Sequence, residues 1–183
     1  MTTKDLINNF LDVTVKVYEQ TKGFLKLSPV QLNWRPSDKQ WSVGECFEHL
    51  MRTNSEYIPH YQKFIMTGIK NKPVQFNHTL VGRMVMNSMK PGNKRKAKTP
   101  SSFNPIGSLV RESIVNDFLL QNNEIVDLVS RMDMSKLKEK ITSPFAKYVK
   151  YNVGDSLMII AHHNLRHLLQ AERVKQNSGF PQS

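Results

Sequence analysis

Apolar residues recur at intervals of three and four along four segments of the chain, which is the spacing of one face of an amphipathic helix. The first segment starts near Leu6 and ends near Gly23, and glycine often follows the last turn of a helix. The second starts at Ser42, the first residue of an S-x-x-E capping box, and ends near Gly68. Pro59 lies inside this second segment and predicts a kink or a split there, because proline lacks the N–H that a helix interior needs.

Two more helical segments follow in the second half of the chain, over about residues 107–132 and 153–176. The connection between the second and third helices is long and contains several prolines, and a short helix is predicted within it at residues 80–89. Residues 133–151 predict an irregular link with β-prone side chains near its end.

These segments together predict an all-α protein: a four-helix bundle with a long crossover between helices 2 and 3. The length of 183 residues suits a single domain over residues 1–183. A long crossover lets helices 2 and 3 be neighbours without being antiparallel, which a short turn does not allow.

The composition narrows the class of protein. Cys46 is the only cysteine, which excludes an intramolecular disulfide and a multi-cysteine zinc site. No apolar stretch approaches the roughly eighteen residues of a membrane-spanning helix. The first ten residues carry Lys4 and Asp5 and lack the apolar block of a signal peptide. We therefore expect a soluble, cytoplasmic protein without a membrane partner.

The formal net charge is +11, and it is concentrated in one part of the chain. Between Tyr57 and Arg111 there are ten basic residues and no acidic residue, and five of the ten lie within residues 90–98. This basic segment has three interpretations: a solvated loop, a surface for nucleic acid or an acidic partner, or a field that steers an anionic small substrate. Nucleic acid is the least favoured partner, because Phe103 is the only aromatic residue near the cluster.

Two histidines on the last predicted helix suggest metal chemistry. His163 and His167 are four residues apart, so both imidazoles lie on one helical face and can reach one ion. The same face carries Ile160 and Val174, which places the pair toward the core. Buried imidazoles need partners, either a metal ion or carbonyl and hydroxyl groups of the core, and the pair alone leaves both interpretations open.

A catalytic site of the zinc type usually takes three protein ligands, and His49 on the second predicted helix is the best third candidate. Cys46 lies one turn earlier and is interpreted as a buried thiol rather than a ligand. No H-E-x-x-H motif is present, so the glutamate base of that protease class is absent. The less favoured histidines are His60, His78 and His162.

Four sequence blocks resemble the DinB-like (YfiT-like) superfamily, whose members are described as metalloenzymes. The blocks are Trp34-Arg35-Pro36, Trp41-Ser42-Val43-Gly44-Glu45, Glu48-His49-Leu50 and His163-Asn164-Leu165-Arg166-His167-Leu168-Leu169-Gln170. The resemblance implies a four-helix bundle, often a homodimer, with a divalent metal ion held by the residues that match the family's three histidines. These are His49, His163 and His167.

The resemblance also implies classes of reaction. Members with known activity include transferases and isomerases in which the metal activates the thiol of mycothiol, bacillithiol or glutathione, and other members are described as hydrolases. We therefore expect a metal-dependent thiol S-transferase or hydrolase acting on a small electrophilic substrate, which the basic segment suggests is anionic. Zinc or nickel is the first expectation for the ion, with iron or copper as alternatives.

A second hypothesis belongs to another class of function. It is a non-enzymatic binding protein that uses residues 57–111 to hold nucleic acid or an acidic partner. No catalytic acid or base is assigned from the sequence.

Overall fold

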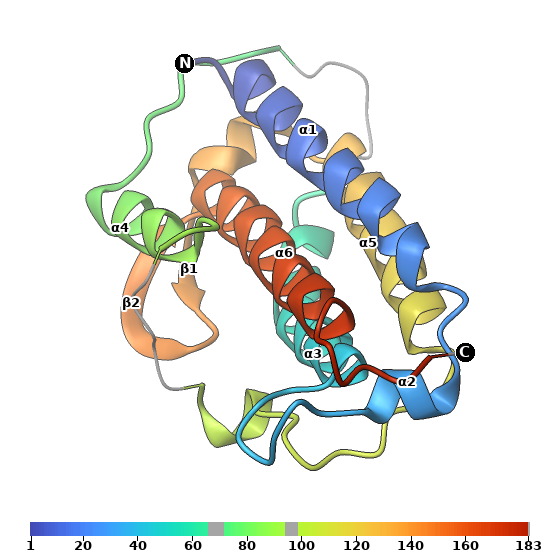
Figure 1. The fold of residues 1–183 in the computed structure, drawn as a ribbon. Coiled ribbons are helices and arrows are strands. Elements are labelled where there is room, and N and C mark those ends of the chain that lie inside the picture. Colours follow the sequence, from blue (N-terminus) through green and yellow to red (C-terminus); the bar gives the residue numbers. More distant parts are fainter. Residues whose placement is uncertain (66–71, 94–98, 183) are drawn as a thin grey trace.

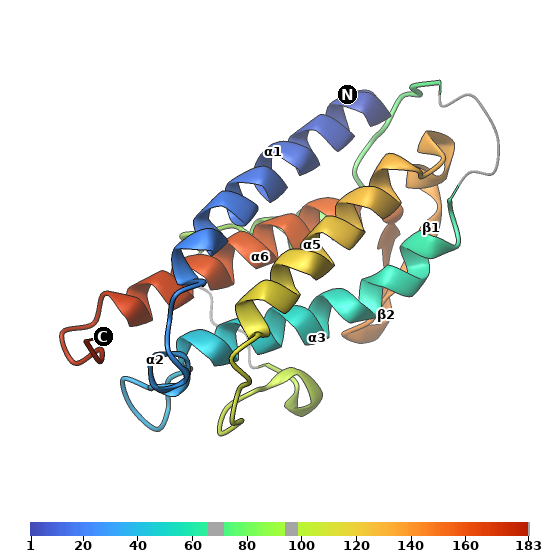
Figure 2. The same cartoon turned by 90° about the vertical axis from the view of Figure 1, so that its right-hand side faces the viewer.

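A computed structural model of the chain describes residues 1–65, 72–93 and 99–182. Four long helices lie alongside one another and form the body of the fold (Figures 1 and 2). They are α1 (Thr3–Thr21), α3 (Val43–Gln62), α5 (Ile114–Ser130) and α6 (Val153–Lys175). The predicted all-α four-helix bundle is confirmed.

Shorter elements connect the long helices. The short helices are α2 (Pro29–Asn33), α4 (Leu80–Met89) and the 3₁₀ turns Lys22–Phe24, Ser101–Phe103 and Met134–Lys138. Strands β1 (Lys140–Ser143) and β2 (Ala146–Asn152) form an antiparallel hairpin before α6. The hairpin occupies the segment that was expected to be an irregular link, and α2 was not predicted. Helix α4 has the predicted bounds.

The crossover makes α3 and α5 parallel neighbours, as its length allows. Near the starts of the two helices Gly44 lies beside Val110, and just beyond their ends Ile65 pairs with Met132 in a β-bridge. Helix α6 packs against both α1 and α3 (Figure 2). Because Tyr61 near the end of α3 is hydrogen-bonded to Ser156 near the start of α6, these two helices are antiparallel.

The sequence predicts a kink or a split at Pro59. The split is wrong, because α3 is continuous to Gln62, and the predicted end near Gly68 lies outside the described residues. The predicted start of the third helix is also wrong. Helix α5 begins at Ile114 rather than at residue 107. The Asn33 side chain accepts a hydrogen bond from the Val110 N–H and donates one to the Val110 carbonyl. Residues before α5 are therefore held by tertiary contacts instead of helical ones.

The start of α3 is fixed by Glu45, which is fully buried. Its carboxylate accepts hydrogen bonds from the Ser42 N–H at 2.8 Å and the Gly107 N–H at 2.6 Å, and pairs with the Arg35 guanidinium at 2.8 and 2.9 Å. Ser42 in turn caps the helix, so the predicted capping box is present. One side chain thus ties together the start of α3, the segment before it and the segment before α5.

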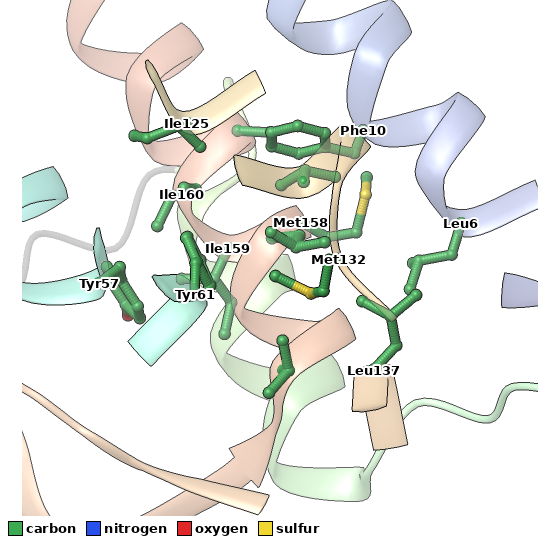
Figure 3. Packing of buried hydrophobic residues seen from close by; sticks show 14 of the residues in the cluster. Leu6, Phe10, Tyr57, Tyr61, Ile125, Met132, Leu137, Met158, Ile159 and Ile160 are labelled. Atoms are coloured by element: carbon green, nitrogen blue, oxygen red, sulfur yellow. The ribbon is translucent and has the colours of Figure 1, made fainter. Parts of the chain in front are cut away.

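The interior contains two apolar clusters separated by a polar layer. One cluster includes Leu6, Phe10, Tyr61 and Ile160, and Figure 3 shows their side chains converging from α1, α3 and α6. The second cluster is built around Phe24, Phe47, Leu50, Phe118 and Leu168. Between the two along α3 and α6 lie buried polar residues, which are His49, Thr53, Asn54, His163 and Asn164. None of the described helices is both long and apolar enough to cross a membrane.

Candidate metal centre

The structure brings together the three histidines that the sequence singled out. His49 comes from α3, and His163 and His167 come from α6. One ring nitrogen from each lies within 4.8 Å of the other two. The Nε2 atoms of His49 and His163 are 3.1 Å apart, close to the separation of two ligands on one tetrahedral ion.

Hydrogen bonds at the opposite ring nitrogens orient two of the three imidazoles. His49 Nδ1 lies 2.7 Å from the Phe103 carbonyl oxygen, which only accepts, so Nδ1 carries the proton and donates. His167 Nδ1–H likewise donates to Gln170 Oε1 at 3.0 Å. In a neutral imidazole the other nitrogen is then unprotonated, so both Nε2 lone pairs are available to an ion.

Burial keeps these imidazoles neutral. His49 is 5% exposed and His163 is 9% exposed. Desolvation lowers the pKa of all three, to about 3 for His167, and the neighbouring rings lower the pKa of His163 and His167 further. At neutral pH the site therefore presents three uncharged nitrogen donors, the form in which histidine binds metals.

The arrangement fits a divalent ion better than a pair of ordinary core histidines. Core imidazoles would bond to carbonyls or hydroxyls through their inward nitrogens, whereas His49 and His163 turn those nitrogens toward each other. His163 Nδ1 is buried and has no protein partner within the described part of the chain. Three neutral nitrogens around one point suit zinc, nickel, iron or copper. That an ion binds here stays a prediction.

Trp41 packs against two of the three rings, a contact that sequence reasoning missed. Its ring stacks on His167, with centroids 5.5 Å apart, and lies against His49 at 4.8 Å. Asn104 Oδ1 accepts the indole N–H at 3.1 Å and holds the ring in place. In the sequence, Trp41 stands before a capped helix and in one of the blocks that resemble the family, and neither fact reveals a contact with a helix more than 100 residues away.

The remaining sequence candidates do not join the group. In the described ranges, His49, His163 and His167 form the only group of three or more metal-capable side chains this close together. His78 instead pairs with the Asp155 carboxylate at 2.6 Å. Cys46 is 1% exposed within the second apolar cluster, and burial raises the pKa of its thiol. The lone buried thiol predicted for this residue is confirmed.

A cavity of about 620 Å³ opens onto the three histidines. Its apolar lining includes Val85, Met89, Phe103, Phe145, Val149 and Ile160. Tyr57 and Tyr151 also line it, with their hydroxyl oxygens 2.7 Å apart. A predominantly apolar cavity with a few polar groups at one place is the usual form of a small-molecule site.

Comparison with known proteins identifies the family. The model of the DinB superfamily matches residues 15–171, a range that contains all three histidines. The chain belongs to the DinB superfamily. One relative in this comparison is the protein YuaE of Bacillus subtilis (strain 168), described as uncharacterized, which is 24% identical over 173 residues covering 91% of this chain and 95% of YuaE. No solved structure matches the chain significantly.

Half of the ten basic residues between Tyr57 and Arg111 lie outside the described residues. Lys94, Arg95, Lys96 and Lys98 all lie outside the described residues. The binding-protein hypothesis therefore stays a prediction, as does the homodimer.

Proposed function

We propose that this DinB-superfamily protein is a metal-dependent enzyme that transfers a low-molecular-weight thiol to a small electrophilic substrate, or hydrolyses that substrate. The observation that carries this proposal is the convergence of three neutral histidine nitrogens at the wall of an apolar cavity. Zinc or nickel is the ion that we expect first, because both accept imidazole ligands readily.

The ligands and their supports have separable roles. His49, His163 and His167 would hold the ion, while the Phe103 carbonyl and Gln170 keep two of the rings in the ligating tautomer. A divalent ion held by neutral ligands keeps its full charge, and so stabilises the anionic form of water or a thiol near neutral pH.

The cavity supplies the setting for the substrate. Its apolar side chains exclude water from the organic part of the substrate, which strengthens polar contacts at the reacting end. Burial raises the pKa of Tyr57 and of Tyr151, so both hydroxyls stay protonated. Because the two hydroxyls share one hydrogen bond, only one of the two protons is left to donate to a substrate oxygen inside the cavity.

The first test is metal content. We expect about one zinc or nickel ion per chain after expression in metal-replete medium, and the His167→Ala variant should lose the ion while keeping its helical circular dichroism. His60→Ala is the matched control, because His60 lies on α3 outside the group. Wild-type protein that stays metal-free and shows no affinity on titration would rule out the proposal.

The second test is chemistry. Metal-loaded protein is screened against small electrophiles with and without low-molecular-weight thiols, and products are identified by mass spectrometry. A thioether product indicates transfer, and a product that has gained water indicates hydrolysis. Either activity should be lost in His167→Ala and retained in His60→Ala. Activity that survives removal of the metal would contradict the proposed role of the three histidines.

A further inference from the structure

A second hollow lies on another side of the three histidines. This groove has a volume of about 650 Å³ and is lined by residues of the segment before α3 and of the second half of α6. It shares Thr99, Arg166 and His167 with the apolar cavity. The two hollows therefore meet at His167, one of the three histidines.

The groove is basic, whereas the cavity is apolar. Lys39, Arg166 and Arg173 line it, and none of the described residues that line it is acidic. Over the described ranges no carboxylate is within ion-pair distance of Lys39 or Arg173, and both residues are exposed. Two cations without acidic partners beside a hollow form a site that favours an anion.

Arg166 stands where the two hollows meet and is held in place. Its Nη1 donates to the Ser88 carbonyl at 2.7 Å, which ties α6 to α4. Arg166 and Arg173 line the groove together with His167, so both guanidinium groups border the same hollow as that ring. Uncharged donors of the groove, Gln40 and Asn177, add hydrogen-bonding capacity at its wall.

We propose that this groove binds an oxyanion, a carboxylate or a phosphate, of the molecule whose apolar part occupies the neighbouring cavity. The inference deepens the proposed function and rests on it for the identity of that molecule, a small amphiphile that extends past His167. Guanidinium groups match the geometry of carboxylate and phosphate oxygens and bind them with two parallel hydrogen bonds, which explains the use of arginine here.

Binding is tested on metal-free protein, so that a direct contact between anion and metal ion does not contribute. The probes are succinate for a carboxylate, methyl phosphate for a phosphate, and succinamide as the uncharged analogue of succinate. The readout is the side-chain N–H resonance of Trp41, which lines the groove, with Trp34 as the internal reference because it does not line the groove. We expect at least one anion to shift the Trp41 resonance, and succinamide to leave it unchanged.

Variants assign the effect to the groove. The double variant Lys39→Gln/Arg173→Gln should weaken binding of the effective anion about tenfold or more. The matched control is Lys4→Gln/Lys16→Gln, which removes the same charge from exposed positions on α1 that line neither hollow. An equal loss in the control, no loss in the groove variant, or equal binding of succinamide would overturn the assignment. The effective probe also shows whether the oxyanion is a carboxylate or a phosphate.

Metal titration of the same variants separates this inference from the proposed function. The groove variant should keep the metal affinity of the wild type, because neither residue is a ligand. If the wild type binds no metal but the groove variant still has a lower affinity for the anion, the proposed function is wrong and the assignment of the groove as an anion site is supported. If metal binds and the groove variant has no effect on anions, the groove assignment fails alone.

Discussion

Gln170 is a side chain whose substitution would test the proposed metal site directly, because it orients one of the three histidines. It accepts the Nδ1–H of His167 and so presents the opposite nitrogen to the ion. Comparable supporting hydrogen bonds in metal sites contribute roughly 10- to 100-fold in affinity. Gln170 lies about one helical turn from His167. This spacing allows the hydrogen bond between the two side chains, but the sequence alone does not establish it.

We predict that Gln170→Ala lowers metal affinity about 10- to 100-fold and leaves the fold intact, because the His167 ring loses its orienting acceptor. Competition with a chromophoric chelator gives the affinity. Gln176→Ala is the matched control, since Gln176 lies on the exposed surface just after α6 and contacts Glu172. Equal affinity in Gln170→Ala and wild-type protein would contradict this role.

Cys46 provides a second prediction at this scale. Its thiol is buried within the apolar cluster and its pKa is raised by that burial, so the reactive thiolate is scarce and inaccessible. An aromatic disulfide reagent should leave folded protein unlabelled and label one thiol per chain in guanidinium chloride. Because Cys46 is the only cysteine, the signal has one source. Rapid labelling after metal removal alone would instead place the thiol at the metal centre.

The three histidines were predictable because helical spacing and family motifs both point to them. Phe103, Trp41 and Asn104 were not recognised as their supports. Phe103 acts through its backbone carbonyl, which every residue possesses, so its side chain gives no signal in the sequence. Trp41 reaches His167 only because α3 and α6 are packed together, and local sequence patterns do not report such tertiary packing.

At the scale of elements, the periodicity located helix interiors better than helix ends. Helix α4 has the predicted bounds, and in the structure Thr79 caps its start and Pro91 follows its end. The start of α5 was misplaced, since Asn33 binds the backbone of Val110 and no local pattern reports a contact 77 residues away. The hairpin before α6 was seen only as β-prone residues.

The contact between α4 and α6 depends on Gly82. A Cβ atom at this position would overlap the carboxylate of Asp155, which receives hydrogen bonds from the Thr79 N–H and hydroxyl and from His78. Asp155 also completes the capping box of α6. A substitution on α4 would therefore disturb the start of the helix that carries two of the three histidines.

We predict that Gly82→Ala lowers the free energy of unfolding by roughly 1–3 kcal/mol, the usual cost of overpacking. Urea denaturation followed by circular dichroism gives the value. Gly23→Ala is the matched control, because nothing lies within 4 Å of a Cβ at Gly23. The control should match the wild type or exceed it by up to about 1 kcal/mol, since alanine restricts the unfolded chain. Equal stability of the two variants would show that α4 shifts to accommodate the new methyl group without a loss of stability.

At the scale of the whole molecule, the metal centre and the fold are separable. The two apolar clusters lie on either side of the histidine layer and draw on all four long helices. Small metal-dependent domains are unfolded without their ion because they lack such cores. Here the bundle has its own cores, so binding of an ion should add to a fold that already exists.

We therefore predict that metal-free protein is folded and that the ion raises its melting temperature. With free metal at about 100 times the dissociation constant, binding adds about 2.7 kcal/mol, which for a chain of this length corresponds to about 5–10 °C. Calorimetry with and without a chelator measures the shift, and circular dichroism measures helicity. His167→Ala should melt at the same temperature with and without the ion. Loss of helicity on chelation would show instead that the ion is part of the fold, because the two apolar clusters would then be too weak to hold the helices together alone.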